Sequence, residues 1–302
     1  MLPLILTILV APTPAEPGAV DVETPAPAPP ASASPPDLGT IPEEILQIAR
    51  SVSDRPLPER MGAISGALLG RPYVSDPLGE GSGVDPDPIA RYDAFDCLTF
   101  TEEVLALSMA GDPAHAAQIR RDLRYGVGNP IDYVHRRHFM ELQWIPGVVE
   151  DGFLRITTSE YGPVKVLDKE IDANTWRWWR PRSKFAHTDE QLPTGTMHLE
   201  VLDLPTAQAA ADRIRPGSVI LTVREDRPGV PLWVTHVSLV VPTGDGGTTM
   251  RHATKIGDGG TRDHDLAWYL EHLESYTNWE VAGIAVLEPI EPGPRRAVVP
   301  EP

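Results

Sequence analysis

The residue that most clearly suggests chemistry is Cys97, the single cysteine among 302 residues. It follows Asp96 in the stretch FDCLTFTEEVLALS, where leucine and valine recur at helical spacing. Because aspartate is a preferred N-cap residue, the stretch predicts a helix with Cys97 in its first turn. The unpaired N–H groups and the helix dipole there favour a thiolate, which could be a nucleophile or a metal ligand. A small, inert core cysteine is the alternative.

A nucleophilic thiol needs a base, and two of the nine histidines lie in strand-like stretches. His236 lies in WVTHVSLVV and His252 in MRHAT, on either side of the turn PTGDG. If the hairpin pairs Val241 with Gly247, the two histidines are directly opposite on one face, with Cβ atoms ~4.5 to 5.5 Å apart. One imidazole could then act as the base and the other could orient it. A one-residue slip would separate them, and two purely structural histidines are the alternative.

Other motifs carry weaker signals. HRRH places His135 and His138 three residues apart, but no third ligand, HExxH or CxxC motif accompanies them, so we expect no metal. GEGSG lacks the Lys-Ser/Thr of a phosphate loop and DGGTRDHD lacks EF-hand spacing, so both are interpreted as turns. The aromatic cluster WRWWR, Trp176 to Arg180, could stack on sugar rings, although packing of an insertion against the core is favoured.

Helices and strands must hold these residues in place. PEEILQIARSV, MGAISGALLG and DPAHAAQIRRDLRYG have helical spacing. Four strands are predicted in GSVILTV, PLWVTHVSLVV, GTTMRHAT and VAGIAVLEPI, with a helix in DHDLAWYLEHLES between the last two. Helices that precede strands indicate an α+β domain, which we assign to residues 39–294 with an insertion at about residues 151–211.

Charge and the chain ends limit the possible partners. With 26 Lys and Arg against 43 Asp and Glu, the net charge of −17 argues against nucleic acid. Residues 1–38 start with a short apolar run and continue rich in Pro and Ala, which we interpret as a weak export signal and a disordered tether. Residues 295–302 are assigned to a tail. We expect an exported, periplasmic or extracellular monomer without a transmembrane span.

Several motifs occur together in an order that resembles a known family. GRPYV, FDCLTF, RPGSVILTV, THVSLVV and RHAT follow one another as in the NlpC-type papain-like cysteine peptidases of the bacterial cell wall. The longer stretches DCLTFTEEVLAL, RRHFMELQWIP and GIAVLEP are similar to the N-acetylmuramoyl-L-alanine amidase-like branch. The resemblance covers about Met61 to Pro292. It implies a papain-like fold, in which N-terminal helices pack on a C-terminal antiparallel sheet.

The resemblance implies a role for each matching residue. Cys97 would be the nucleophile, His236 the general base and then acid, and His252 the third residue, which fixes the tautomer of His236. Tyr73 would line the site and help to hold the oxyanion. Asp96 would cap the helix and shape the pocket.

The resemblance also assigns Arg136 and His138 to a substrate-side or structural motif of the amidase-like branch. Three residues depart from the family pattern. Ser218 replaces an aspartate, Ser238 replaces a glycine and Leu98 replaces a serine. None of them is the nucleophile or the base, so we expect the departures to affect pocket width and substrate choice.

The function implied is hydrolysis of the N-acetylmuramoyl-L-alanine amide of peptidoglycan through a thioester, without a cofactor. Three alternatives remain open at this point. The same fold could cut a peptide bond in the stem peptide, it could bind the cell wall without catalysis, or it could transfer an acyl group to or from a lipid or amine.

Overall fold

The computed structural model describes residues 39–291, so the predicted export signal, tether and tail lie outside the described residues. The described chain contains both helices and antiparallel strands, which confirms the α+β class. Its α-helices are α1 (Glu43–Ser51), α2 (Leu57–Ala67), α3 (Cys97–Met109), α4 (Ala116–Tyr125), α5 (Ile145–Glu150), α6 (Ala173–Trp178), α7 (Leu204–Ala210) and α8 (Leu266–Leu273). No helix within residues 39–291 is long and apolar enough to cross a membrane.

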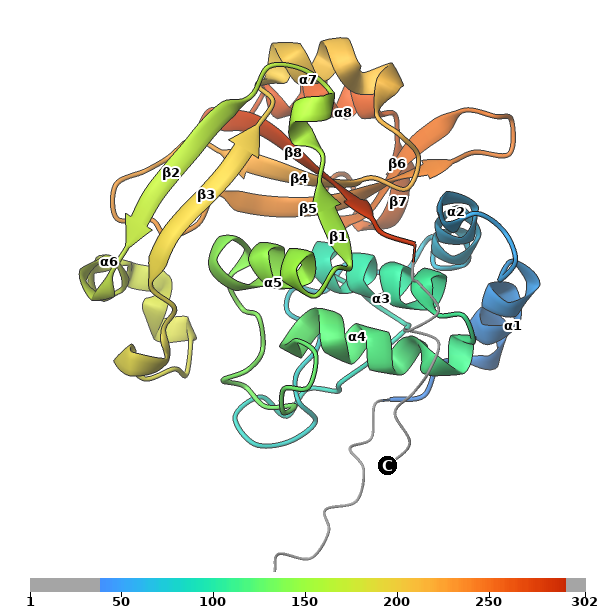
Figure 1. Ribbon diagram of the computed structural model, residues 1–302, viewed down its shortest axis with the longest axis horizontal. Helices are drawn as coiled ribbons and strands as arrows, with labels where there is room; N and C mark the ends of the chain where they lie inside the picture. Colours follow the sequence, from blue (N-terminus) through green and yellow to red (C-terminus); the bar gives the residue numbers. More distant parts are fainter. Residues whose placement is uncertain (1–38, 292–302) are drawn as a thin grey trace, which may run out of the picture. The chain divides into compact units, whose positions relative to one another are not determined.

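One antiparallel sheet has the strand order β1-β8-β4-β5-β6-β7, and a separate hairpin pairs β2 with β3. The strands are β1 (Leu154–Ile156), β2 (Lys165–Ile171), β3 (Gly195–Val201), β4 (Val219–Arg224), β5 (Val234–Pro242), β6 (Thr248–Thr254), β7 (Gly260–His264) and β8 (Val281–Pro289). Helices α1 to α5 cover one face of the larger sheet, and α7 and α8 cover the other (Figure 1). Val219 and Leu221 pack on the first side and Ile220 on the second, because successive side chains of a strand alternate between faces.

The predicted N-terminus of α3 is confirmed by a capping box. The backbone N–H of Thr99 donates to Asp96 Oδ1 at 2.8 Å, and the backbone N–H of Asp96 donates to Thr99 Oγ1 at 3.0 Å. Both donors would otherwise be unsatisfied at the helix start. The box therefore fixes where α3 begins and where Cys97 lies.

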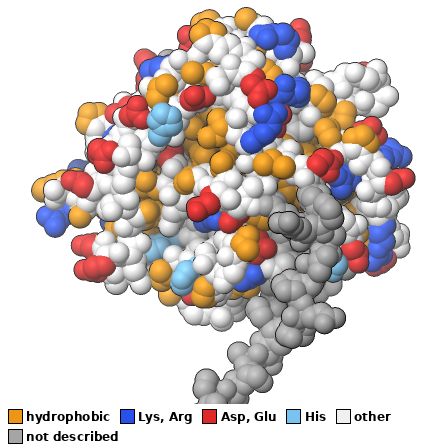
Figure 2. Space-filling model, in the orientation of Figure 1, with side chains coloured by type: hydrophobic (Ala, Val, Ile, Leu, Met, Phe, Trp, Pro, Cys, Tyr) orange, Lys and Arg blue, Asp and Glu red, His pale blue; other side chains and the backbone are white. Residues whose placement is uncertain are grey.

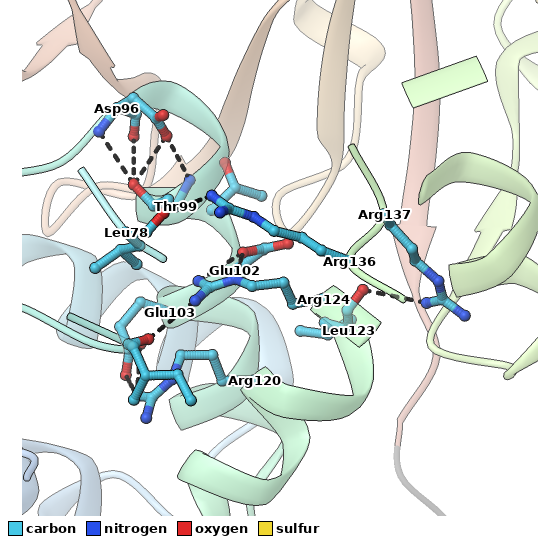
Figure 3. Close-up of polar contacts among 12 residues, drawn as sticks. Leu78, Asp96, Thr99, Glu102, Glu103, Arg120, Leu123, Arg124, Arg136 and Arg137 are labelled. Atoms are coloured by element: carbon cyan, nitrogen blue, oxygen red, sulfur yellow. Dashed lines mark hydrogen bonds and ion pairs between the residues drawn. The ribbon is translucent and has the colours of Figure 1, made fainter. Parts of the chain in front are cut away.

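Two buried ion pairs join α3 to α4. Glu102 accepts from Arg124 and Glu103 from Arg120, each at 2.9 Å, and all four side chains are at most 5% exposed (Figure 3). Trp144 Nε1 also donates to Glu102 at 3.0 Å. Because a buried charge without its partner costs several kcal/mol, these pairs hold the two helices in one relative position.

A carboxylate from another element holds the start of β5. Glu141 lies in the π-helical turn η2 (Met140–Trp144), and its Oε1 accepts from the backbone N–H groups of Trp233 and Val234 at 2.5 Å each. Burial raises the pKa of Glu141, while the two N–H donors lower it. The contact connects the helical layer to the strand that carries His236.

The predicted insertion contains the β2–β3 hairpin and α6, which extend from the main sheet (Figure 1). Its aromatic cluster is mostly structural. Trp176 and Trp179 are buried and lie against Phe139 and Phe185, respectively, whereas Trp178 is 76% exposed. The interpretation of DGGTRDHD as a turn alone was wrong, because Gly260–His264 forms strand β7. Acidic and basic side chains are interspersed on the face shown in Figure 2.

Candidate active site

Cys97 occupies the first turn of α3, as predicted, and is partly exposed. Its sulfur faces the backbone N–H groups of Val237, Cys97 itself and Leu98, all of which lower its pKa. Burial and the neighbouring Asp96 outweigh them and raise the pKa of the thiol to about 12. The net shift is opposite to the one that the helix start alone favours, because removing the sulfur from water disfavours its charge more than the helix N-terminus favours it.

His236 and His252 are in contact, as the hairpin argument expected. His236 Nε2 lies 2.7 Å from His252 Nδ1. The predicted register was nevertheless wrong by two residues, since Val241 pairs with Thr249 and not with Gly247. Strand side chains alternate with a period of two, so this slip kept both histidines on one face and made them diagonal neighbours.

A third histidine, His264 of β7, continues the line of imidazoles. His252 Nε2 lies 2.8 Å from His264 Nδ1, and the ring of His264 stacks on Trp268 with centroids 4.7 Å apart. Sequence reasoning missed this residue, because it interpreted the polar stretch around it as a turn. His264 is the histidine of DHDLAW, and only the pairing of β7 with β6 brings it next to His252.

All three imidazoles favour the neutral form. Burial lowers the pKa of His236 to about 4 and that of His252 to about 2, and it also lowers the pKa of His264. If His236 donates its Nε2–H to His252 and His252 donates its Nε2–H to His264, every ring has one consistent tautomer. His236 Nδ1 then remains as the nitrogen that can accept a proton.

His236 lies at a cavity of about 530 Å³, a volume that suits a small ligand. We call it the His236 cavity; its lining residues are Tyr73, Thr222, Arg224, Thr235, His236, Thr254, Lys255, Ile256, Gly257, Tyr269, His272, Leu273 and Tyr276. Burial first, and then the nearby Cys97 and Asp96, raise the pKa of Tyr73 to about 12, so its phenol stays a hydrogen-bond donor. The predicted site residues Tyr73 and His236 thus share one cavity.

Asp96, Arg136 and His138 line a different hollow of about 290 Å³, together with Leu98, and we call it the Arg136 hollow. Burial raises the pKa of Asp96. Arg136 donates to Asp85 at 2.8 Å. It also donates to the carbonyl oxygen of Leu78 at 2.5 Å (Figure 3). Cys97 itself lines neither hollow: its chain neighbours Asp96 and Leu98 line the Arg136 hollow, and Tyr73 and His236 line the His236 cavity.

His138 has a structural environment in this hollow. Its Nε2 lies 2.7 Å from the carbonyl oxygen of Tyr133, and burial lowers its pKa to about 4. His135 instead contacts Asp132 at 2.7 Å, so the two histidines of HRRH have separate partners. The substrate-binding roles of Arg136 and His138 stay predictions.

The departures from the family pattern lie in two environments. Ser218 and Ser238 are fully buried and line neither cavity, and their effect on pocket width stays a prediction. Ser238 lies in β5, and Ser218 lies in the turn directly before β4. Helices cover both faces of these strands. Leu98, in contrast, lines the Arg136 hollow.

Comparison with known proteins gives a family and a fold. The model of the AmiA-like family, described as N-acetylmuramoyl-L-alanine amidase-like, matches residues 63–275. A search of proteins with curated functions found no match. A protein from Legionella pneumophila superposes with a TM-score of 0.70 at 20% identity, covering 82% of this chain and 94% of that protein.

Two Bacteroides structures are also similar. An N-acetylmuramoyl-L-alanine amidase from Bacteroides uniformis has a TM-score of 0.60 at 22% identity, with 77% of this chain and 98% of that one covered. A putative xylanase from Bacteroides fragilis has a TM-score of 0.54 at 22% identity, with 74% and 98% covered. At such identities the likeness shows the fold alone, as the two different activity names illustrate.

Proposed function

Since this chain belongs to the AmiA-like family of N-acetylmuramoyl-L-alanine amidase-like proteins, we propose that it hydrolyses the amide between the lactyl group of muramic acid and L-alanine in peptidoglycan. Cys97 is the nucleophile, His236 the general base and acid, and His252 the residue that orients His236. The arrangement of helix, sheet and catalytic residues is papain-like in this proposal. The protein acts outside the cytoplasm, because its substrate lies there.

The reaction starts from a neutral thiol and a neutral imidazole. As Sγ attacks the amide carbonyl carbon, the S–H proton passes to Nδ1 of His236. The sulfur makes no hydrogen bond to an imidazole within residues 39–291, and catalytic hydrogen bonds of a free enzyme often tighten only when substrate binds. The oxyanion accepts hydrogen bonds from backbone N–H groups at the start of α3 and from the Tyr73 hydroxyl.

Breakdown of this intermediate releases the peptide. The C–N bond breaks, the proton on His236 moves to the departing amine, and the acyl group remains on Cys97 as a thioester. His236 then takes a proton from water while the water oxygen attacks the thioester, and the sulfur recovers a proton as the acid leaves.

The observation that supports this proposal most strongly is the contact between His236 and His252. Because the contact uses Nε2 of His236, the ring is held with Nδ1 available for proton transfer. The next residue, Val237, directs its backbone N–H at the sulfur of Cys97, so the nucleophile lies beside the strand that carries the base. A neutral pair in this arrangement suits general-base attack on an amide.

The test is digestion of intact peptidoglycan sacculi, with mass spectrometry of the fragments. Free lactyl ends on muramic acid together with peptides that begin at L-alanine would support the amidase. New ends within the stem peptide would instead identify an endopeptidase. If neither product forms and the protein only sediments with the sacculi, a binding module is the better account. The variant His236→Ala, checked for folding by circular dichroism, serves as the inactive control.

A further inference from the structure

The His236 cavity has an unusual charge for this protein. The chain carries 43 Asp and Glu against 26 Lys and Arg, yet no described residue that lines this cavity is acidic. Two cations line it instead, Arg224 at the end of β4 and Lys255 directly after β6. The cavity therefore presents positive charge in a molecule of net negative charge, and this attracts anions.

Arg224 is held in place by groups that leave its charge unpaired. Its Nε donates to Thr235 Oγ1 at 3.1 Å, its Nη1 donates to the carbonyl oxygen of Trp279, and its guanidinium lies 4.4 Å from the centre of the Tyr276 ring. Nη2 has no hydrogen-bond partner among residues 39–291, and no carboxylate there forms an ion pair with Arg224. A guanidinium fixed in this way is pre-organised for an anion.

Lys255 supplies the second positive charge in the lining of the same cavity. Its Nζ lies 5.1 Å from the centre of the Tyr73 ring, and the side chain is exposed. Within the described chain it forms no ion pair. Asp258, the acidic residue three positions later, is paired with Arg262 at 2.5 Å.

The Arg136 hollow shows the opposite arrangement. Its arginines are already paired, Arg136 with Asp85 at 2.8 Å and Arg137 with Asp151 at 2.6 Å. Lys184 also lines this hollow and forms no ion pair among the described residues, so it provides a matched control. The guanidinium that is both held in place and without an ion pair among the described residues is thus Arg224, in the His236 cavity.

The side of the scissile bond follows from the proposed function, on which this inference rests. His236 returns its proton to the leaving amine, so the cavity that it lines must receive the amine half of the substrate. We propose that Arg224 and Lys255 bind a carboxylate of an acidic peptide attached to that amine. The cavity thereby selects amides whose leaving group is an anionic peptide.

The test uses a peptide that mimics the amine product, so that binding is measured without catalysis. L-Alanyl-D-glutamate and its diamide have nearly the same shape and the same free amine, but only the first carries carboxylates. Isothermal titration of the full-length wild-type protein should show binding of the dipeptide that is about tenfold or more tighter than binding of the diamide. The preference should shrink between 0.05 and about 0.5 M salt, because salt screens exposed charges.

Two double variants with the same change in net charge separate the sites. Arg224→Gln with Lys255→Met should abolish the preference for the dipeptide, whereas Arg177→Gln with Lys184→Met should keep it. The inference would be overturned if the Arg177 and Lys184 variant lost the preference for the dipeptide while the Arg224 and Lys255 variant kept it. Equal affinity of the wild type for both peptides, or no binding of either, would also overturn it. Should the first variant fail to fold, Lys255→Met alone carries the test, because this side chain is exposed.

Hydrolysis of sacculi, measured beside peptide binding, distinguishes failure of this inference from failure of the proposed function. Cleavage at the lactyl amide without a carboxylate preference would overturn the anion site and leave the amidase intact. A carboxylate preference that depends on Arg224 and Lys255, in a protein that cleaves nothing, would overturn the amidase and leave the anion site.

Discussion

At the scale of single residues, the protonation of Cys97 is decided by its surroundings. Three backbone N–H groups favour the thiolate, but burial and Asp96 favour the thiol more strongly. The sequence around Asp96 could predict where the helix starts, because a cap is a local feature. It could not predict the direction in which the pKa of the Cys97 thiol shifts. Burial depends on β5 and the other elements that pack over α3, and these come from distant parts of the chain.

A raised thiol pKa predicts slow and strongly pH-dependent alkylation. The reactive species is the thiolate, so the rate with iodoacetamide should keep rising by about tenfold per pH unit beyond pH 9, where an ordinary thiol levels off. Because Cys97 is the single cysteine, intact-protein mass spectrometry reports on it alone. The urea-unfolded protein is the control, and a native plateau below pH 8 would contradict the account.

His264 is predicted to act as a positioning residue through His252. His264→Phe removes the acceptor for His252 Nε2–H and should lower kcat/KM by roughly tenfold, the value of one neutral hydrogen bond. His264→Gln keeps an acceptor and should recover most of the activity. His135→Phe should have no effect, because the ring of His135 contacts Asp132 and not this line of imidazoles. Equal losses in the Phe and Gln variants would indicate a structural role only.

At the scale of elements, the hairpin of β5 and β6 shows what a pattern can predict. The alternation of side chains along a strand predicted that His236 and His252 lie on the same face of the sheet. Alternation is a local property, so this prediction held although the predicted register was wrong. Strand β7 was missed, because GTRDH at the sheet edge contains no apolar alternation. The sequence could therefore predict the pair His236 and His252 but not the third imidazole.

The ion pairs between α3 and α4 are predicted to contribute strongly to stability. Arg124→Met leaves the buried Glu102 without its partner and should lower the free energy of unfolding by about 3 to 5 kcal/mol in urea titrations. The matched variant Arg177→Met changes an exposed arginine and should shift it by less than about 0.5 kcal/mol. A loss below about 1 kcal/mol for Arg124→Met would show that the pair does not hold the helices.

At the scale of the whole molecule, the order of helices before strands predicted the α+β class. The two hollows beside Cys97 could not be predicted, because each is lined by segments far apart in the chain, such as Tyr73, Arg224 and Tyr276. Their shape depends on how whole layers pack, and spacing within one segment carries no information about it. The division of charge between the two hollows follows from the same packing.

Buried imidazoles predict a loss of stability in mild acid. The pKa of His252 is about 2 in the folded chain, against 6.5 as its ordinary value, so the unfolded chain binds its proton first as the pH falls. Stability from this residue is complete above pH 6.5 and should fall by about 2 kcal/mol between pH 7 and pH 5. The gap in unfolding free energy between wild type and His252→Asn should therefore narrow over this range. A constant gap would contradict the buried neutral imidazole.

The most direct test of the central claim is the rate of lactyl-amide cleavage by Cys97→Ala on sacculi, followed through new L-alanine amino termini. The account predicts a loss of at least about a thousandfold relative to wild type, because no other side chain can form the thioester. Binding of L-alanyl-D-glutamate should persist in the same variant. A Cys97→Ala protein that cleaves at the wild-type rate would contradict the account.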